Sequence, residues 1–129
     1  MRLLIDTNGY KAFCTGDRAA LDVIQLADEI VLPFVVLAEL RAGFACGTVA
    51  RRNEAALVKF LNSPRVRVAY PDEGTTHHYA RLFFQLRTQG TPIPTNDIWI
   101  AALAVQHNLP LFTRDRHFDH LPQLARTDH

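Results

Sequence analysis

The chain has 129 residues, of which 48% are hydrophobic and 21% are charged, and its formal net charge is +1 at pH 7. These values predict one globular domain over residues 1–129, with enough apolar residues for a core. No apolar run approaches the roughly 20 residues of a membrane-spanning helix. No signal sequence precedes Leu3, so a cytoplasmic protein is expected. Cys14 and Cys46 lack metal-site spacing and indicate free thiols in a reducing compartment.

The basic residues are mostly arginine, and only Lys11 and Lys59 are lysine. The planar guanidinium group suits phosphate and carboxylate partners. Arginine enrichment also follows from a GC-rich genome, and the net charge is close to zero. The composition therefore leaves nucleic-acid binding open.

Apolar, β-branched runs alternate with segments of helical periodicity along the chain. In chain order we expect a strand at Leu3–Ile5, a helix beginning at Tyr10–Phe13, a helix at Arg18–Ala27, a strand at Glu29–Phe34, helices at Val35–Phe44 and Ala50–Leu61, a strand at Val66–Tyr70, helices at His77–Leu86 and Asp97–His107, a strand at Leu109–Thr113 and a short turn at His117–Leu121. Such alternation favours an α/β sandwich with a mainly parallel sheet.

Acidic residues stand where predicted strands end or predicted helices begin. Asp6 follows the first strand and Asp115 follows the last one. In an open parallel sheet, ligands bind beyond the carboxyl ends of the strands, so both residues are expected at one edge. A second interpretation stays open, because Asp6, Thr7 and Asn8 are also residues that cap helices. The same holds for Asp97, in the first turn of its predicted helix.

Capping does not explain Glu39, which lies inside an apolar helix. The residues three and four positions away share its face and are all non-polar: Val35, Val36, Ala42 and Gly43. A helix that is apolar on every side is expected to be buried. A buried carboxylate is costly unless it is paired, protonated or bound to a metal. Pairing with a distant arginine remains an alternative, and a functional carboxylate is the preferred interpretation.

Asp6, Glu39, Asp97 and Asp115 are therefore expected to converge on one edge of the sheet. At about 4 Å, each pair of ionised carboxylates costs on the order of 4 kcal/mol at an effective dielectric constant near 20. A hard divalent cation removes this repulsion, and Mg²⁺ and Mn²⁺ both favour oxygen ligands. Such an ion makes a bound water a better nucleophile and polarises a phosphoryl oxygen. The predicted chemistry is hydrolysis of a phosphodiester.

Several other classes lack their required residues. A phosphatase of the haloacid-dehalogenase type needs an Asp where this chain has Asn8. A response-regulator receiver domain needs a late lysine, and no lysine follows Lys59. Neither a glycine-rich phosphate loop nor a dinucleotide motif appears. The histidines have no cysteine partner or HExxH pattern, so a zinc site is not expected. His117, near Asp115, could donate to a phosphate, and a plain surface residue is the preferred interpretation.

Four segments around the predicted acids form an ordered set: "LIDTN" near the start, "AEL" around Glu39, "NDIWIAALA" around Asp97 and "LFTRDRHF" around Asp115. They resemble, in the same order, motifs of PIN-domain ribonucleases, and their spacing resembles the VapC-type toxins of bacterial toxin–antitoxin pairs. Each motif alone is weak, but the ordered set is specific and spans Leu3 to Leu121. The resemblance implies a PIN-like three-layer α/β/α sandwich with a short, mainly parallel sheet.

It also implies a Mg²⁺- or Mn²⁺-dependent endoribonuclease that acts on RNA, forms a homodimer and is held inactive by a cognate antitoxin. By position, the family's acidic quartet, which serves as metal ligands and catalytic residues, corresponds to Asp6, Glu39, Asp97 and Asp115. Polar residues that line its site correspond to Thr7, Asn8 and Thr113. The alternative is a non-catalytic PIN-like module that binds RNA or a partner. Neither the RNA that is cleaved nor the antitoxin is specified by the sequence.

The last motif departs from the family pattern. Many relatives carry a further acid immediately before the Phe, where this chain has His117. The number of metal ions, one or two, therefore stays open. A contribution from His117 or from Asp119, which ranks below Asp115, also stays open. Arg114 and Arg116 are expected to contact RNA phosphates.

An antitoxin segment is expected to dock near the site. Tyr10, Phe13 and Phe44 lie on predicted helices and could form an apolar groove, although Phe13 and Phe44 are equally good core residues. An arginine from the antitoxin could reach the acids from there.

Overall fold

In the computed structural model, which describes residues 1–127, four short strands form one parallel sheet. The strands are β1 (Arg2–Ile5), β2 (Glu29–Pro33), β3 (Val66–Ala69) and β4 (Leu111–Phe112), in the order β3-β2-β1-β4. The expected short, mainly parallel sheet is therefore confirmed. Because β1 is central, its carboxyl end opens between the segments that follow β2 and β4.

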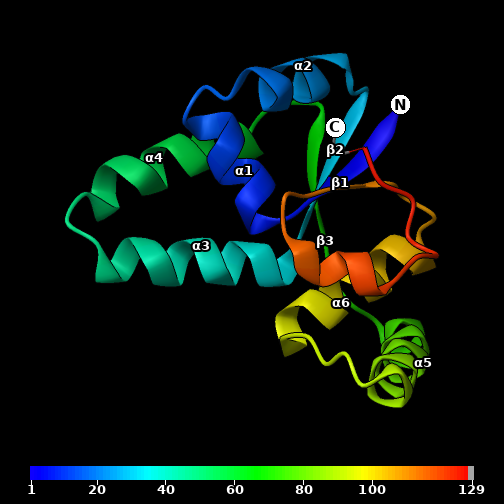
Figure 1. The fold of residues 1–129 in the computed structure, drawn as a ribbon. Coiled ribbons are helices and arrows are strands. Elements are labelled where there is room, and N and C mark those ends of the chain that lie inside the picture. The colour runs from blue at the N-terminus through cyan, green and yellow to red at the C-terminus, as the bar shows by residue number, and fades with distance from the viewer. Residues whose placement is uncertain (128–129) are drawn as a thin grey trace.

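Helices cover both faces of the sheet. They are α1 (Thr7–Cys14), α2 (Arg18–Leu26), α3 (Phe34–Cys46), α4 (Ala50–Leu61), α5 (Glu73–Gln89), α6 (Thr95–Gln106) and the 3₁₀ helix η1 (Arg116–His120). Helices α1, α2 and α4 lie on one side of the strands and α5 and α6 on the other, which confirms the three-layer α/β/α arrangement (Figure 1). In residues 1–127 no helix combines the length and apolar character that crossing a membrane requires.

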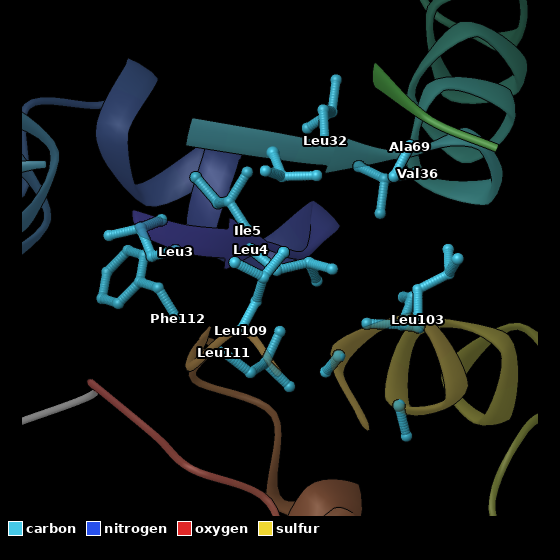
Figure 2. Packing of buried hydrophobic residues seen from close by; sticks show 14 of the residues in the cluster. Leu3, Leu4, Ile5, Leu32, Val36, Ala69, Leu103, Leu109, Leu111 and Phe112 are labelled. Atoms are coloured by element: carbon cyan, nitrogen blue, oxygen red, sulfur yellow. The ribbon is translucent and has the colours of Figure 1, made fainter. Parts of the chain in front are cut away.

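The core explains why β1 reads as a continuous apolar run. Leu3, Leu4 and Ile5 are fully buried, as expected for a strand of a parallel sheet covered on both faces. Figure 2 shows them between Leu32 of β2, Phe112 of β4 and Leu103 of α6. The strand is thus held from every side, which fixes the position of the residue that follows it.

Gly9 lets α1 start immediately after β1. A Cβ atom at this position would lie 2.9 Å from Ile5 Cγ1 and 2.9 Å from the Phe112 carbonyl oxygen. Glycine therefore allows the first turn of α1 to approach the ends of β1 and β4 more closely than any other residue could. This approach brings Asp6 and Thr7 to the carboxyl edge of the sheet.

Helix ends differ from the sequence prediction where capping residues act. Helix α1 begins at Thr7, before Tyr10, because the Asp6 side chain caps it. Helix α5 begins at Glu73, before His77, because Asp72 and Thr75 form a capping box. The predicted turn at His117–Leu121 is a 3₁₀ helix shifted by one residue, with Asp115 as its N-cap. Strand β4 is shorter than predicted, at two residues.

Helix α3 is less buried than its composition suggests. Val36, Leu37 and Leu40 face the core, but most residues after Leu40 are exposed, and α3 projects away from the sheet beside α4 (Figure 1). The expectation that this helix is buried on every side is therefore wrong. The apolar residues of the first turns of α3 pack into the core, whereas those of the last turns lie on a solvent-exposed surface.

Candidate metal-binding active site

The four predicted acids come together at the carboxyl edge of the sheet. Asp6 directly follows β1, Asp115 lies just beyond β4, Asp97 is in the first turn of α6, and Glu39 is in the middle of α3. They line one cleft of ≈ 460 Å³ together with Thr7, Asn8, Lys11, Ala42 and Ile100. The sequence thus predicted this convergence, because three of the four acids stand at element ends that the parallel topology brings together.

Asp6 is both a helix cap and a member of the acidic cluster. One carboxylate oxygen, Oδ1, accepts a hydrogen bond from the Gly9 backbone N–H at 2.7 Å, and Oδ2 accepts one from the Thr113 hydroxyl. Burial raises the pKa of Asp6 to about 6, although both hydrogen bonds lower it, and the charges of Asp115 and Asp97 raise it further. The two interpretations of this residue are therefore not exclusive.

Asp97 has no capping role. Helix α6 has Pro94 at its N-cap position and no side-chain cap, so the capping interpretation is wrong here. Its Oδ2 lies 2.8 Å from His117 Nδ1 instead. Partial burial raises the pKa of Asp97, the hydrogen bond from His117 opposes this, and the negative charges of Asp115 and Glu39 add to the increase. Asp97 is therefore an acid held in the cleft by its neighbours.

Glu39 is half-buried at the rim of the cleft, where the Thr7 hydroxyl donates a hydrogen bond to its Oε1 at 2.7 Å. Within residues 1–127 no ion pair to Glu39 is found, and the adjacent Arg41 binds Glu54 at 2.9 Å. The alternative that Glu39 is neutralised by a distant arginine is therefore not supported. Thr7 links α1 to α3 and orients this carboxylate.

The loop after β4 is built around Thr113 and Asp115. The fully buried Thr113 accepts a hydrogen bond on Oγ1 from the Asp115 backbone N–H at 2.9 Å, and Asp115 Oδ1 accepts one from the His117 backbone N–H at 2.9 Å. Asp119 does not line the cleft and is exposed, where it forms an ion pair with Arg126 at 2.7 Å. The geometry therefore places Asp115, rather than Asp119, in the cleft.

His117 is exposed, as the preferred interpretation expected, but its ring also contacts two of the acids. Its Nδ1 lies 2.8 Å from Asp97 Oδ2 and 3.0 Å from Asp115 Oδ1. The sequence left a contribution of His117 open, because no cysteine partner or HExxH pattern accompanies it. The signal that could have found it is the 3₁₀ turn after Asp115, which folds the next side chains back toward α6.

The basic residues are arranged differently from the sequence prediction. Arg114 forms an ion pair with Asp17, the N-cap of α2, so this interaction holds the loop after β4 against α2. Arg116 is exposed at the start of η1. Lys11, one helical turn after Thr7, lines the acidic cleft and was not singled out from the sequence.

The donor groups of the cleft fit a divalent cation. Four carboxylates offer hard oxygen ligands, and Asp97, Asp115 and His117 provide ligand atoms within 4.8 Å of one another. Burial raises the pKa of Asp6, and the charges of Asp115 and Asp97 raise it further, so the ionised form of this carboxylate is disfavoured in the cleft. A cation bound here would compensate its negative charge.

The sequence matches the PIN domain family over residues 3–124. Ribonuclease VapC1 of Haemophilus influenzae (strain R2866) is 34% identical over 102 residues, which cover 78% of this chain and 75% of that protein. Ribonuclease VapC5 of Mycobacterium tuberculosis (strain ATCC 25618 / H37Rv) is 28% identical, covering 97% and 91%. The chain belongs to the PIN-domain family, and the expected similarity to VapC ribonucleases is confirmed.

Solved structures agree with this assignment. VapBC-1 from nontypeable Haemophilus influenzae superposes with a TM-score of 0.85 at 30% identity, covering 99% of this chain and 98% of that one. VapBC2 from Rickettsia felis, solved bound to a DNA fragment from its promoter, gives a TM-score of 0.88 at 26% identity, with coverage of 99% and 98%. The PIN fold therefore extends over nearly the whole chain.

Proposed function

We propose that this protein is a Mg²⁺- or Mn²⁺-dependent endoribonuclease that hydrolyses phosphodiester bonds of RNA. The observation that carries the proposal is the convergence of four carboxylates on one cleft, with Asp6 buried at its base. Relatives named VapC ribonucleases support the choice of RNA as substrate.

The metal would be held chiefly by Asp6 and Asp97, with Glu39 and Asp115 completing the acidic set. When bound, the cation supplies an activated water and a positive charge next to the phosphoryl oxygens. The remaining tasks belong to the chain itself. Thr113 and Thr7 fix the orientation of the Asp6 and Glu39 carboxylates through their hydrogen bonds, so that little reorganisation is needed when the substrate binds.

Substrate phosphates need positive partners at the rim of this acidic cleft. Lys11 lies on the exposed side of α1 and lines the cleft, and Arg116 is exposed next to Asp115. Asn8, also exposed at the cleft, offers an amide for a hydrogen bond to the ribose or a base. Arg114 is engaged with Asp17, so we assign it a role in positioning the loop instead of the RNA contact expected from the sequence.

The test is cleavage of a mixed RNA substrate by the purified protein with Mg²⁺ or Mn²⁺, with EDTA, and with the Asp97→Asn variant. Asp97 caps no helix, so its replacement should leave the fold intact. We expect cleavage only by the parent protein and only with metal. Cleavage that persists after exhaustive chelation, or undiminished in Asp97→Asn, would contradict the mechanism. RNA binding without cleavage under every condition would instead favour the non-catalytic module.

We further propose that the protein is the toxin of a type II toxin–antitoxin pair and forms a homodimer. The VapBC complexes among its structural neighbours support an antitoxin partner. Tyr10 and Phe44 line a pocket of ≈ 350 Å³ between α1, α3 and α4, which offers an apolar docking surface. Phe13 lines a different cavity, against Phe60, so the expected groove is divided between two hollows.

Expression in a bacterial host tests this second proposal. The parent chain should arrest growth, Asp97→Asn should not, and co-expression of the protein encoded by the neighbouring reading frame should restore growth. A cognate partner that binds neither the Tyr10–Phe44 pocket nor the acids would refute the docking site.

Light scattering of the purified protein tests the homodimer. A monomeric mass at micromolar concentration would exclude it.

A further inference from the structure

We propose that His117 is a nitrogen ligand of the metal site and that it makes this site prefer Mn²⁺ and later first-row transition metals over Mg²⁺. The inference rests on the proposed function only in placing a divalent cation among the acids. It goes further in assigning a ligand outside the acidic quartet and a metal selectivity to this particular chain.

The first support is the geometry of the three donor atoms. His117 Nδ1 lies 2.8 Å from Asp97 Oδ2 and 3.0 Å from Asp115 Oδ1, and the ligand atoms of the three residues all lie within 4.8 Å. Adjacent ligands of an octahedral ion with bonds of about 2.1 Å are about 3 Å apart. The imidazole nitrogen therefore already stands at the separation that a shared cation requires.

The second support is that the position of His117 is fixed by its backbone. Its N–H donates to Asp115 Oδ1 at 2.9 Å, and the next residue, Phe118, is fully buried and anchors η1. The side chain is partly exposed, at 46% of its surface, yet its ring is turned toward the two carboxylates. The ring thus lies at the cleft because of the 3₁₀ turn and needs no rearrangement of the main chain to reach a cation.

The chemical consequence follows from ligand preference. Mg²⁺ is satisfied by carboxylates and waters and gains little from an imidazole, whereas imidazole is a favourable ligand for transition metals. Affinity for divalent first-row metals at a given nitrogen and oxygen site increases from Mn²⁺ toward Cu²⁺. Replacing an oxygen donor by His117 should therefore raise the affinity for Mn²⁺ relative to Mg²⁺.

The simplest rival is that His117 only donates a hydrogen bond that holds Asp97 and Asp115 in place. A spectroscopic readout separates the two roles, because only a directly bound nitrogen gives strong hyperfine coupling to Mn²⁺. We would record pulsed electron paramagnetic resonance spectra of the Mn²⁺-loaded parent, of His117→Gln and of His120→Gln. His120 is a matched control, since it lies three residues later in the same helix and is exposed.

We expect nitrogen coupling in the parent and in His120→Gln and its loss in His117→Gln. Calorimetry with each metal alone should show the ratio of Mg²⁺ to Mn²⁺ dissociation constants falling about tenfold in His117→Gln and His117→Asp, with no change in His120→Gln. His117→Asp should keep or improve Mg²⁺ binding, which shows that the cleft is intact in that variant.

Coupling that is absent in the Mn²⁺-loaded parent, or unchanged in His117→Gln, would overturn the inference. An unchanged ratio of dissociation constants in His117→Asp would overturn the claimed selectivity. The outcome is separable from the fate of the proposed function, because no RNA is used. A parent that shows nitrogen coupling but cleaves no RNA supports the ligand and refutes the ribonuclease, and a parent that cleaves RNA without coupling does the reverse.

Discussion

The Thr113 hydroxyl donates a hydrogen bond to the Asp6 carboxylate, although 107 residues separate the two positions. The same Oγ1 accepts the backbone N–H of Asp115 at 2.9 Å. One buried hydroxyl thereby couples the acid after β1 to the loop that carries the acid after β4. This relay of hydrogen bonds fixes two of the four carboxylates relative to each other.

Thr113→Val should weaken both the fold and the site while keeping the shape of the side chain. Removing a buried donor to a charged acceptor costs about 1.5–3 kcal/mol of unfolding free energy, and loosening of the acids should lower RNA cleavage by about tenfold to a hundredfold. Urea unfolding and a cleavage assay measure the two effects. Thr113→Ser keeps the hydroxyl and should retain most of the stability and most of the cleavage activity. Equal losses of stability and activity in the Val and Ser variants would contradict the relay.

Asp6→Asn should be more stable than the parent at neutral pH without metal. Burial raises the pKa of Asp6 from 3.8 to about 6, so the folded state binds this proton more tightly than the unfolded chain does. The contribution of this group to stability is complete below pH 4 and is lost as the pH rises to about 6. At about 1.4 kcal/mol per pKa unit, the loss is on the order of 3 kcal/mol.

Urea unfolding of both proteins in EDTA from pH 4 to pH 8 tests this sign. The asparagine can keep the cap of α1. The charge of Asp97 acts on Asp6, so Asp6→Asn also relieves repulsion of Asp97, which adds to the advantage of the variant in the same direction. The advantage of the variant should grow between pH 4 and pH 6 and then level off. A difference that is the same at pH 4.5 and at pH 7.5 would show that Asp6 carries no buried charge.

The sequence predicted the sheet and the acidic edge because both depend on signals within a few residues. Strand β1 is apolar on both faces, and Asp6 follows it directly, so topology alone placed that acid. The role of Arg114 could not be predicted in this way, since its partner Asp17 is 97 residues away. The contacts of His117 with Asp97 and Asp115 could not be decided either, because they depend on the 3₁₀ turn after Asp115. The exposure of the last turns of α3 could not be predicted, because it depends on how far along the helix the rest of the protein packs.

Arg114→Ala and Asp17→Asn should resemble each other and leave RNA affinity unchanged. Both remove the ion pair that holds the loop after β4 to α2, while asparagine keeps the cap of that helix. Each substitution should lower RNA cleavage several-fold, because Asp115 becomes less ordered when the loop is released. The double variant should cleave RNA at the same rate as either single variant. The check is RNA binding by both variants at several salt concentrations. If the salt dependence of the affinity becomes flatter in Arg114→Ala alone, Arg114 contacts the RNA directly.

Lys11→Met should weaken RNA binding with little effect on stability. Lys11 is exposed on α1 and lines the acidic cleft, where its ammonium group can reach a phosphate of the bound strand. Loss of one phosphate contact should reduce the slope of log affinity against log salt by about 0.7 for a single strand.

Arg116→Ala should also weaken RNA binding and reduce its salt dependence, because this side chain is exposed beside Asp115.

Lys59→Met is the matched control for Lys11→Met, since the sequence contains only these two lysines and Lys59 lines a separate cavity between α2 and α4. Both substitutions change the net charge by the same amount, so a general electrostatic effect would lower RNA affinity equally in the two variants. A specific contact would change only the Lys11 variant. To prevent cleavage, each lysine variant is combined with Asp97→Asn, and RNA binding is measured from 50 to 300 mM salt. This measurement distinguishes a specific contact from a general electrostatic effect. Equal salt slopes for the two lysine variants would place the RNA away from α1.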